Sequence, residues 1–120
     1  MWSRLEKWQN SFDSGMTREK YFIVCEQTGV EPNPDKIPPE IQDFPQDVQT
    51  AMILFNKLGD RIYPDIGYLG KDYTQLPIYM DVYEVKDRKI FLETLLRLDS
   101  TVIKKSQEAL KRERDKIKRS

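Results

Sequence analysis

The stretch from residue 65 to residue 77, DIGYLGKDYTQLP, holds the residue types that could build a binding site: a Gly-Lys pair beside two tyrosines and two aspartates. A phosphate-binding loop needs glycines in a six-residue frame before Lys-Ser/Thr, because stacked backbone amides hold the phosphates while the hydroxyl binds magnesium. Here Asp72 follows Lys71. We therefore interpret the stretch as a connection that needs positive φ at Gly67 and Gly70. On this interpretation, replacing Lys71 is nearly silent.

Other side chains with catalytic potential are scattered along the chain. Four aspartates could be drawn into a metal site or an acid–base pair: Asp60, Asp65, Asp72 and Asp81. Nothing in their spacing makes them converge on one point, as magnesium binding or glycoside chemistry requires. Cys25 lies in an apolar run without a basic neighbour to favour its thiolate, which indicates a buried, inert thiol. We expect no catalytic residue, no metal site and no cofactor.

Composition excludes further classes of chemistry. The chain has 120 residues, with 20 basic and 20 acidic side chains, no histidine and one cysteine. Zinc sites built from Cys and His, Ser-His-Asp triads, Cys-His dyads and intramolecular disulfides are therefore excluded. The N-terminal MWSRLEKWQNSF carries charges and lacks the apolar core of a signal peptide, and no run of about 18 apolar residues predicts a membrane span. We expect a cytosolic protein that does not enter a membrane.

The charges are unevenly distributed. Residues 104–120 hold eight basic and three acidic side chains, a net of +5, whereas residues 26–47 hold six acids and one lysine. The chain is therefore a dipole with an acidic middle and a basic end. The basic end has no aromatic residues and has acids interleaved, so it is a weaker signal for nucleic-acid binding than a basic patch with stacking residues.

Apolar periodicity and capping residues predict two helices in the first third of the chain. Trp2, Leu5, Trp8 and Phe12 recur at helical spacing, which predicts a short amphipathic helix over residues 2–12. A second helix is expected over residues 17–28, with a threonine as N-cap and Gly29 after its end. Four prolines within EPNPDKIPPE then predict a stiff, extended connector without helix over residues 31–39.

The rest of the chain predicts three more helices. The strongest is expected over residues 45–58, with Pro45 at its first position and one apolar face; that face comprises Val48, Ala51, Met52, Phe55 and Leu58. Residues 59–73 hold three glycines and a proline without a sustained period, which predicts a loop. Helical spacing resumes over residues 76–85, although IYMDVYEV also alternates loosely, as a strand would. Asp87 can cap a last helix that continues without Gly or Pro to the C-terminus.

These elements predict an all-α fold, a small bundle of four to five helices with a long, projecting C-terminal helix. A helix of about thirty residues spans about 45 Å, longer than a domain of this size needs. We divide the chain into a helical domain over residues 1–103 and a basic helical extension over residues 104–120. The expected core comprises Phe22, Met52, Phe55, Leu58, Tyr83, Phe91, Leu95 and Leu98.

Two sets of apolar residues are candidates for contact with partners. Ile103, Leu110 and Ile117 repeat every seven residues on an otherwise charged helix. That stripe is too narrow for a full two-stranded coiled coil but suits docking on a partner or weak self-association. Trp2 and Trp8 belong either to the core or to a partner-binding surface. The chain beyond Ile103 has few apolar residues, so we expect it to be dispensable for folding.

Several segments together resemble small proteins of T4-like tailed bacteriophages. They are CEQTGVEPNP, then IPPEIQDFPQDVQTAMILFNKLGDRIYPDIGYLGKDYTQLP, then FLETLLRLDSTVIKKSQEALKRERDKIKR. The resemblance covers most of the chain and implies a structural or assembly-chaperone component of the tail or baseplate. It carries over no functional residues.

We therefore expect a non-enzymatic phage assembly or structural protein that binds other phage structural proteins, in the host cytoplasm or incorporated in the virion. The alternative is a small regulatory adaptor that binds nucleic acid or the transcription machinery through its basic tail. Salt dependence separates the two hypotheses, because contacts to phosphates lose affinity steeply with salt whereas apolar docking does not.

Overall fold

The computed structural model describes residues 1–119, apart from the side chains of Asp13 and Arg119. Residue 120, the last of the expected extension 104–120, lies outside the described residues. The chain forms two compact units, an N-terminal unit over Met1–Pro45 and a C-terminal unit over Gln46–Ser120. None of the helices within residues 1–119 is long and apolar enough to cross a membrane.

The N-terminal unit begins with the two expected helices. Helix α1 spans Trp2–Ser14 and ends at Gly15, whose φ of 70° is the left-handed conformation that favours glycine. Helix α2 spans Arg18–Thr28, and the Thr17 hydroxyl accepts a hydrogen bond from the Lys20 amide at its first turn. The second helix therefore lies between its predicted capping residues, whereas the first continues two residues beyond the predicted end.

The proline-rich connector folds back along α2. A short 3₁₀ helix, Pro34–Lys36, lies within residues 31–39, where the sequence predicted a connector without helix, and a second one, Ile41–Asp43, follows. The Asn33 amide donates to the Tyr21 hydroxyl at 3.0 Å, and the Arg18 guanidinium donates to the Pro38 carbonyl at 3.1 Å. These bonds hold the connector against the helix that precedes it.

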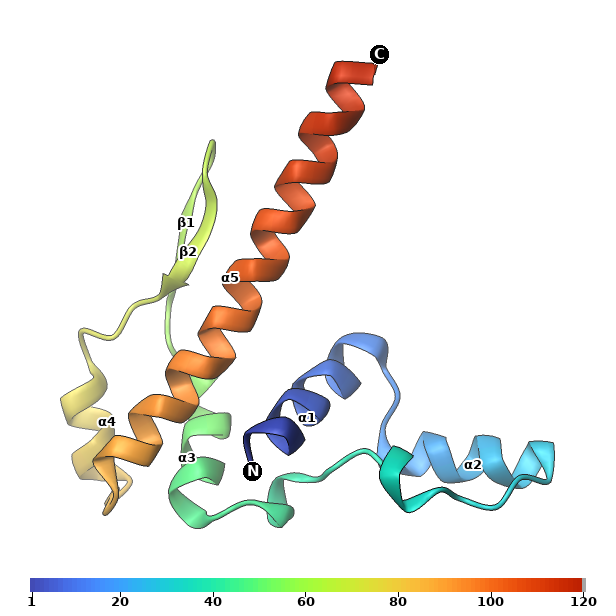
Figure 1. Cartoon of the computed structure of the whole chain (residues 1–120). Helices are drawn as coiled ribbons and strands as arrows, with labels where there is room; N and C mark the ends of the chain where they lie inside the picture. Colours follow the sequence, from blue (N-terminus) through green and yellow to red (C-terminus); the bar gives the residue numbers. More distant parts are fainter. Residues whose placement is uncertain (120) are drawn as a thin grey trace. The chain divides into compact units, whose positions relative to one another are not determined.

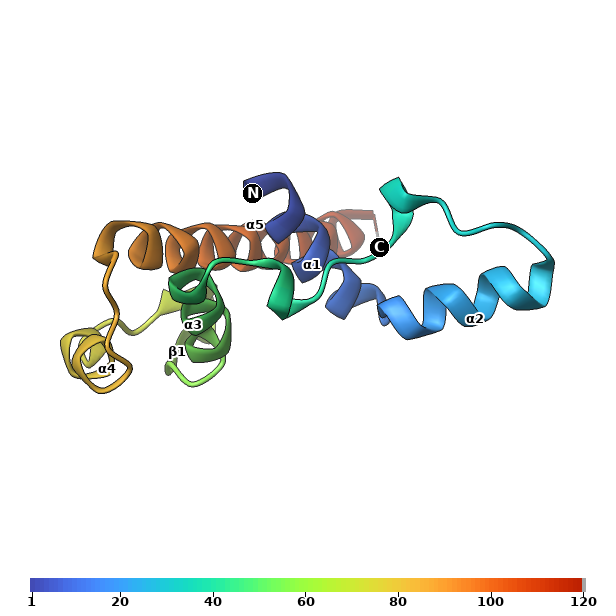
Figure 2. The same ribbon diagram turned by 90° about the horizontal axis from the view of Figure 1, so that it is seen from below.

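The C-terminal unit is organised by one long helix (Figure 1). Helix α5 spans Arg88–Arg119 and begins where the Asp87 carboxylate accepts a hydrogen bond from the Ile90 amide at 3.1 Å. Helices α3, Gln46–Phe55, and α4, Leu76–Val82, precede it in the chain. The view in Figure 2 places α3, α4 and strand β1 on the same side of α5.

The all-α prediction is wrong, because residues 59–73 contain a β-hairpin rather than a loop. Strand β1, Asp60–Tyr63, pairs antiparallel with strand β2, Gly67–Lys71, so the fold is α+β. A bulge lies between the pairs Arg61–Gly70 and Ile62–Tyr68. The hairpin packs on the middle of α5 (Figure 1). Its glycines resemble loop signals in the sequence, but in the structure they let a strand approach the helix closely.

The core follows the apolar faces of α3 and α5. The expected core residues on these elements, and Leu58 just after α3, are buried: Met52, Phe55, Leu58, Phe91, Leu95 and Leu98. Two other expected core residues are not, since Phe22 and Tyr83 are each 41% exposed. Phe22 lies on α2, where the apolar residues occupy consecutive positions rather than one face. Tyr83 follows the end of α4, and its hydroxyl accepts a hydrogen bond from the Lys57 ammonium.

Candidate functional site

The hairpin is fastened to α5 by a buried carboxylate. Asp99, on α5, is only 4% exposed and accepts hydrogen bonds from three donors of the hairpin region. The Tyr68 hydroxyl donates to Oδ1, and the Tyr73 hydroxyl and the Lys71 backbone amide donate to Oδ2, the last at 2.9 Å. Buried carboxylates are costly unless hydrogen bonded, and here three donors offset that cost.

Both phenols remain protonated donors in this setting. Burial is the main cause that raises the pKa of Tyr68 above its usual range, and the hydrogen bond to Asp99 raises it further. Burial and the same carboxylate raise the pKa of Tyr73. A phenol that keeps its proton can donate to Asp99 over the whole physiological pH range. The cluster therefore works as a structural clamp, which we call the Asp99 clamp: Asp99, Tyr68, Tyr73 and the Lys71 amide.

The side chain of Lys71 supports the hairpin beside the clamp. It is 8% exposed, and its ammonium lies 2.6 Å from the Asp60 carboxylate on the paired strand. The same ammonium lies 4.6 Å from the centre of the Phe55 ring and donates to the Leu58 carbonyl at 3.4 Å. The prediction that replacing Lys71 is nearly silent rested on the backbone geometry of the glycines, whereas the structure buries the lysine side chain inside the fold.

Two glycines of β2 allow the strand to lie directly on α5. Gly67 has a φ of +87°, and a Cβ built there would stand 2.8 Å from Leu110 Cδ1. Gly70 has a φ of +121°, and its Cβ would stand 3.1 Å from the Asp99 carboxylate and 3.5 Å from Ile103. The predicted positive φ at both glycines is confirmed. Their second role, close approach to a helix, is a product of the tertiary structure.

The hairpin held by this clamp presents apolar side chains to solvent. All four residues of β1 are exposed, including Ile62 at 65% and Tyr63 at 53%, and Ile66 in the turn is 58% exposed. Ile62 and Tyr63 are consecutive strand residues and so project from opposite faces of the hairpin, and exposed apolar groups of this kind can contact other proteins. We call these three residues the hairpin tip.

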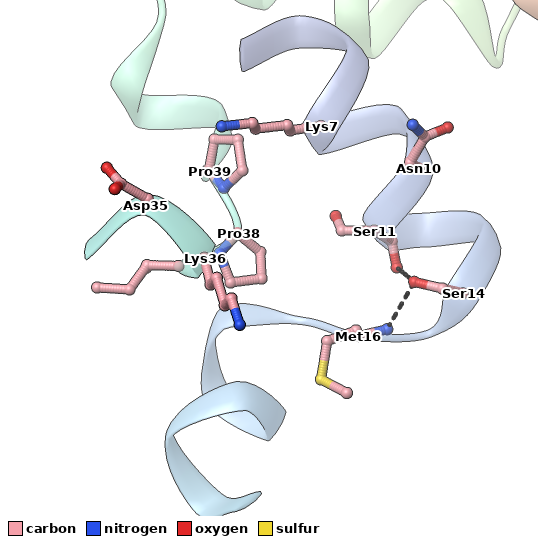
Figure 3. A pocket seen from close by; sticks show the side chains of 10 residues that line it. Lys7, Asn10, Ser11, Ser14, Met16, Asp35, Lys36, Pro38 and Pro39 are labelled. Carbon is pink, nitrogen blue, oxygen red and sulfur yellow. Dashed lines mark hydrogen bonds between the residues drawn. The ribbon is translucent and has the colours of Figure 1, made fainter. Parts of the chain in front are cut away.

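A pocket of about 390 Å³ lies within the N-terminal unit, between α1 and the connector (Figure 3). Its lining residues are Lys7, Asn10, Ser11, Ser14, Met16 and 35–39. Figure 3 shows Lys7 reaching over Pro39 and the Lys36 ammonium directed toward Met16. The two serine hydroxyls already donate to carbonyls of α1, at 2.7 Å and 3.3 Å. The pocket thus has two exposed lysines beside two buried prolines. Its lining does not bring together side chains that could act as a catalytic group.

A second hollow of about 340 Å³ in the same unit, the Trp8 groove, has aromatic walls. It is lined by Trp8, Ser11 and Phe12 of α1, by residues 17–19 and by residues 39–42. The Trp8 and Phe12 rings meet edge to face, with centroids 4.8 Å apart, and Phe12 is 66% exposed. Carboxylates of Glu19 and Glu40 stand among the lining residues. The groove can accept an apolar or cationic side chain.

The five residues proposed for partner binding lie in different environments. Trp2 and Trp8 are half-buried on α1. Ile103 and Leu110 are also half-buried, and both face glycines of the hairpin. Of the heptad stripe, Ile117 has the most exposed side chain, at 73%. Two of the three stripe residues therefore pack against the hairpin.

The extension 104–120 begins in the part of α5 that contacts the hairpin. The Ser106 hydroxyl accepts a hydrogen bond from the Tyr68 amide at 3.4 Å, and Leu110 lies beneath Gly67. Beyond Leu110 every described side chain, over residues 111–118, is exposed. Ser106 and Leu110 therefore pack against the hairpin, whereas residues 111–118 are the solvated part of the helix.

Sequence reasoning missed Asp99 as a key residue, although one signal for it was present. Phe91, Leu95 and Asp99 follow each other at steps of four, so the aspartate continues the apolar face of the helix. A carboxylate on a buried face needs donors from another element. The tyrosines that supply them lie 31 and 26 residues away, and no local pattern connects them.

Comparisons of the chain with models of protein families, with curated proteins and with solved structures gave no match. Within residues 1–119, no group of three or more His, Cys, Asp or Glu side chains is placed to hold a metal ion.

Proposed function

We propose that this chain is a non-enzymatic assembly or structural protein that acts through contacts with other proteins. The observation that carries this proposal is the hairpin tip, in which Ile62, Tyr63 and Ile66 are all more than half exposed. The tip belongs to a hairpin that is anchored to α5 by hydrogen bonds to the buried Asp99 carboxylate, which restricts its freedom. A preorganised apolar surface binds with a smaller entropic cost than a flexible one.

The resemblance to small proteins of T4-like tailed bacteriophages supports a more specific role, in virion morphogenesis at the tail or baseplate. In that role the partners are other phage structural proteins, and the chain acts in the host cytoplasm or within the virion. The interpretation needs no catalytic residue or cofactor, because the hairpin tip works by shape and apolar contact.

A photocrosslinking experiment tests this proposal. Tyr63 is replaced by p-benzoylphenylalanine in the full chain, which is produced in cells infected by a tailed phage that encodes it. Tyr83 supplies the matched control, since it is an exposed tyrosine of the same unit, at 41%, but lies outside the hairpin. We expect crosslinks from position 63 to one or a few virion proteins, identified by mass spectrometry, and none of these from position 83. Equal crosslinking from both positions, or crosslinks only to host proteins, contradicts the proposal.

The regulatory alternative has one specific observation in its favour. Residues 111–118 are all exposed and hold five basic and two acidic side chains, so a polyanion could contact them. Binding of a labelled DNA duplex in a salt series tests this alternative. A steep loss of affinity with salt, removed by neutralising Lys111, Arg112 and Arg114, would favour the adaptor over the assembly protein.

A further inference from the structure

We propose that the Trp8 groove of one copy of this chain binds the basic end of α5, residues 111–118, of a second copy. The inference rests on the assembly role proposed above and names one partner within it, the chain itself. It concerns a surface separate from the hairpin tip, so the two can be tested independently.

The groove offers the chemistry for a cationic, partly apolar ligand. The faces of the Trp8 and Phe12 rings attract cations and apolar groups alike. Glu19 is exposed at the margin of the groove. The charge of Arg18 in the same lining is already matched, since its guanidinium lies 2.7 Å from Asp43 and 3.7 Å from Glu40. A second positive charge therefore meets carboxylates and ring faces rather than repulsion.

The basic end of α5 has the matching chemistry. Residues 111–118 carry a net charge of +3, and all their side chains are exposed. Ile117 lies among these charges with 73% of its surface exposed, whereas Leu110, one heptad earlier, is covered by the hairpin. The exposed apolar group of the stripe is thus the one surrounded by lysines and arginines. An amphipathic helix end that lays an apolar residue into a groove is a common mode of recognition.

Charge complementarity favours a second copy as the occupant. The groove lining holds two acids, Glu19 and Glu40, and one basic residue, Arg18, while residues 104–120 carry a net of +5. One chain therefore supplies both halves of the contact. Because the two patches differ, the interface is head-to-tail. Each copy can bind one neighbour through its Trp8 groove and another through residues 111–118.

The groove is small, about 340 Å³, near the lower end of the range for ligand pockets, so it accommodates side chains rather than a large interface. We therefore expect weak self-association that depends on concentration and decreases as salt is raised.

Sedimentation velocity of the purified full chain, after nuclease treatment, tests the inference across a concentration series at low and high salt. Wild-type chain should show an average mass that rises with concentration, and more so at low salt. Phe12→Ala should weaken the association about tenfold, because it removes one wall of the groove. Phe22→Ala is the matched control, an exposed phenylalanine on α2 outside the groove lining, and should leave the association unchanged.

Charge reversal gives a sharper test. Arg112→Glu with Arg114→Glu should abolish the association, whereas Lys86→Glu with Lys89→Glu, which changes net charge equally, should preserve it. Glu19→Lys alone should also associate poorly. Mixing Glu19→Lys with the Arg112→Glu/Arg114→Glu variant should restore association, since the unchanged basic end of the first variant meets the unchanged groove of the second.

Three outcomes overturn the inference: a wild-type chain that stays monomeric throughout the series, an equal loss in the control variants, or association that disappears on nuclease treatment. A monomeric chain that still crosslinks to virion proteins through position 63 rejects self-association and leaves the assembly role intact. A chain that self-associates but gives no such crosslinks supports the groove contact and rejects the assembly role of the hairpin tip.

Discussion

Asp99 and Asp43 each accept three hydrogen bonds, one in each unit of the chain, but their surroundings differ. Asp99 is 4% exposed and its donors are neutral, two phenols and a backbone amide. The Asp43 side chain is 29% exposed; its donors are the guanidinium groups of Arg18 and Arg4 and the Glu40 amide. Water and salt reach the second cluster but hardly the first, so similar hydrogen bonds should contribute different free energies.

The exposed ion pairs of Asp43 are therefore a weaker source of structural specificity than the uncharged donors around Asp99. The exposed arginine–aspartate pairs join a connector to two helices at modest energetic value. The uncharged donors around Asp99 fix the position of a hairpin, because a buried carboxylate tolerates few alternative arrangements.

The largest expected effect is that of Asp99→Ala, which leaves the buried Lys71 amide and two partly buried phenols without an acceptor. We expect a loss of about 2–4 kcal/mol in the free energy of unfolding, measured by urea denaturation. Hydrogen exchange should show that amides of residues 60–71 lose protection while those of α3 and the first half of α5 keep it. Asp99→Asn is the control and should cost about 1 kcal/mol, because its oxygen can replace Oδ2 and the Tyr68 hydroxyl can rotate to accept from its NH₂. A loss under about 1 kcal/mol for the alanine variant would remove the contrast with Asp43.

Gly67→Ala should come next and tests the backbone geometry beside the clamp. The substitution places a Cβ at a φ of +87° and 2.8 Å from Leu110 Cδ1, which we expect to cost about 1–3 kcal/mol. Gly59→Ala is the matched control, since its Cβ meets nothing within 4 Å and its φ is ordinary. That variant should be neutral or stabilise the fold by up to about 1 kcal/mol. Thermal unfolding of both variants decides, and equal midpoints would refute the close approach of β2 to α5.

Lys71→Ala should destabilise the fold by about 1–2 kcal/mol, in place of the nearly silent effect that the sequence suggested. The change removes the packed stem, the contact with the Phe55 ring and the partner of Asp60. Lys71→Met keeps most of the stem and should lose less, under about 1 kcal/mol. If urea unfolding gives equal losses for the two variants, the charge rather than the packing is what Lys71 contributes.

The smallest effect concerns Asp43 and is best seen as a pH dependence. The Glu40 amide, followed by Arg18, holds the pKa of Asp43 below its ordinary value of 3.8. The stability it contributes is thus fully present above pH 3.8 and is lost as the pH falls through the lower folded pKa. Asp43→Asn should lower stability near neutral pH by less than about 1 kcal/mol and flatten the acid limb of the stability curve. High salt should shrink this difference but leave that of Asp99→Ala unchanged, and a salt-sensitive Asp99 would undo the comparison.

The amino-acid sequence by itself determined the positions of the helices and the core of α3 and α5. Thr17, Gly29 and Asp87 mark helix ends through hydrogen bonds or backbone conformations that involve only neighbouring residues. Apolar residues at steps of three and four on α3 and α5 are buried because helical geometry places them on one face. These are local effects, so a single sequence is sufficient to predict them.

Only the tertiary structure determined that residues 60–71 form a hairpin, that Lys71 is buried, and that Leu110 packs against Gly67. Strands of four and five residues carry little periodic signal, and the glycines of β2 predict a loop when considered alone. The hairpin is defined instead by contacts across large separations, such as the 31 residues between Tyr68 and Asp99. A carboxylate that is solvated in one context becomes a buried clamp in another, because its energy depends on donors that the chain brings from a distance.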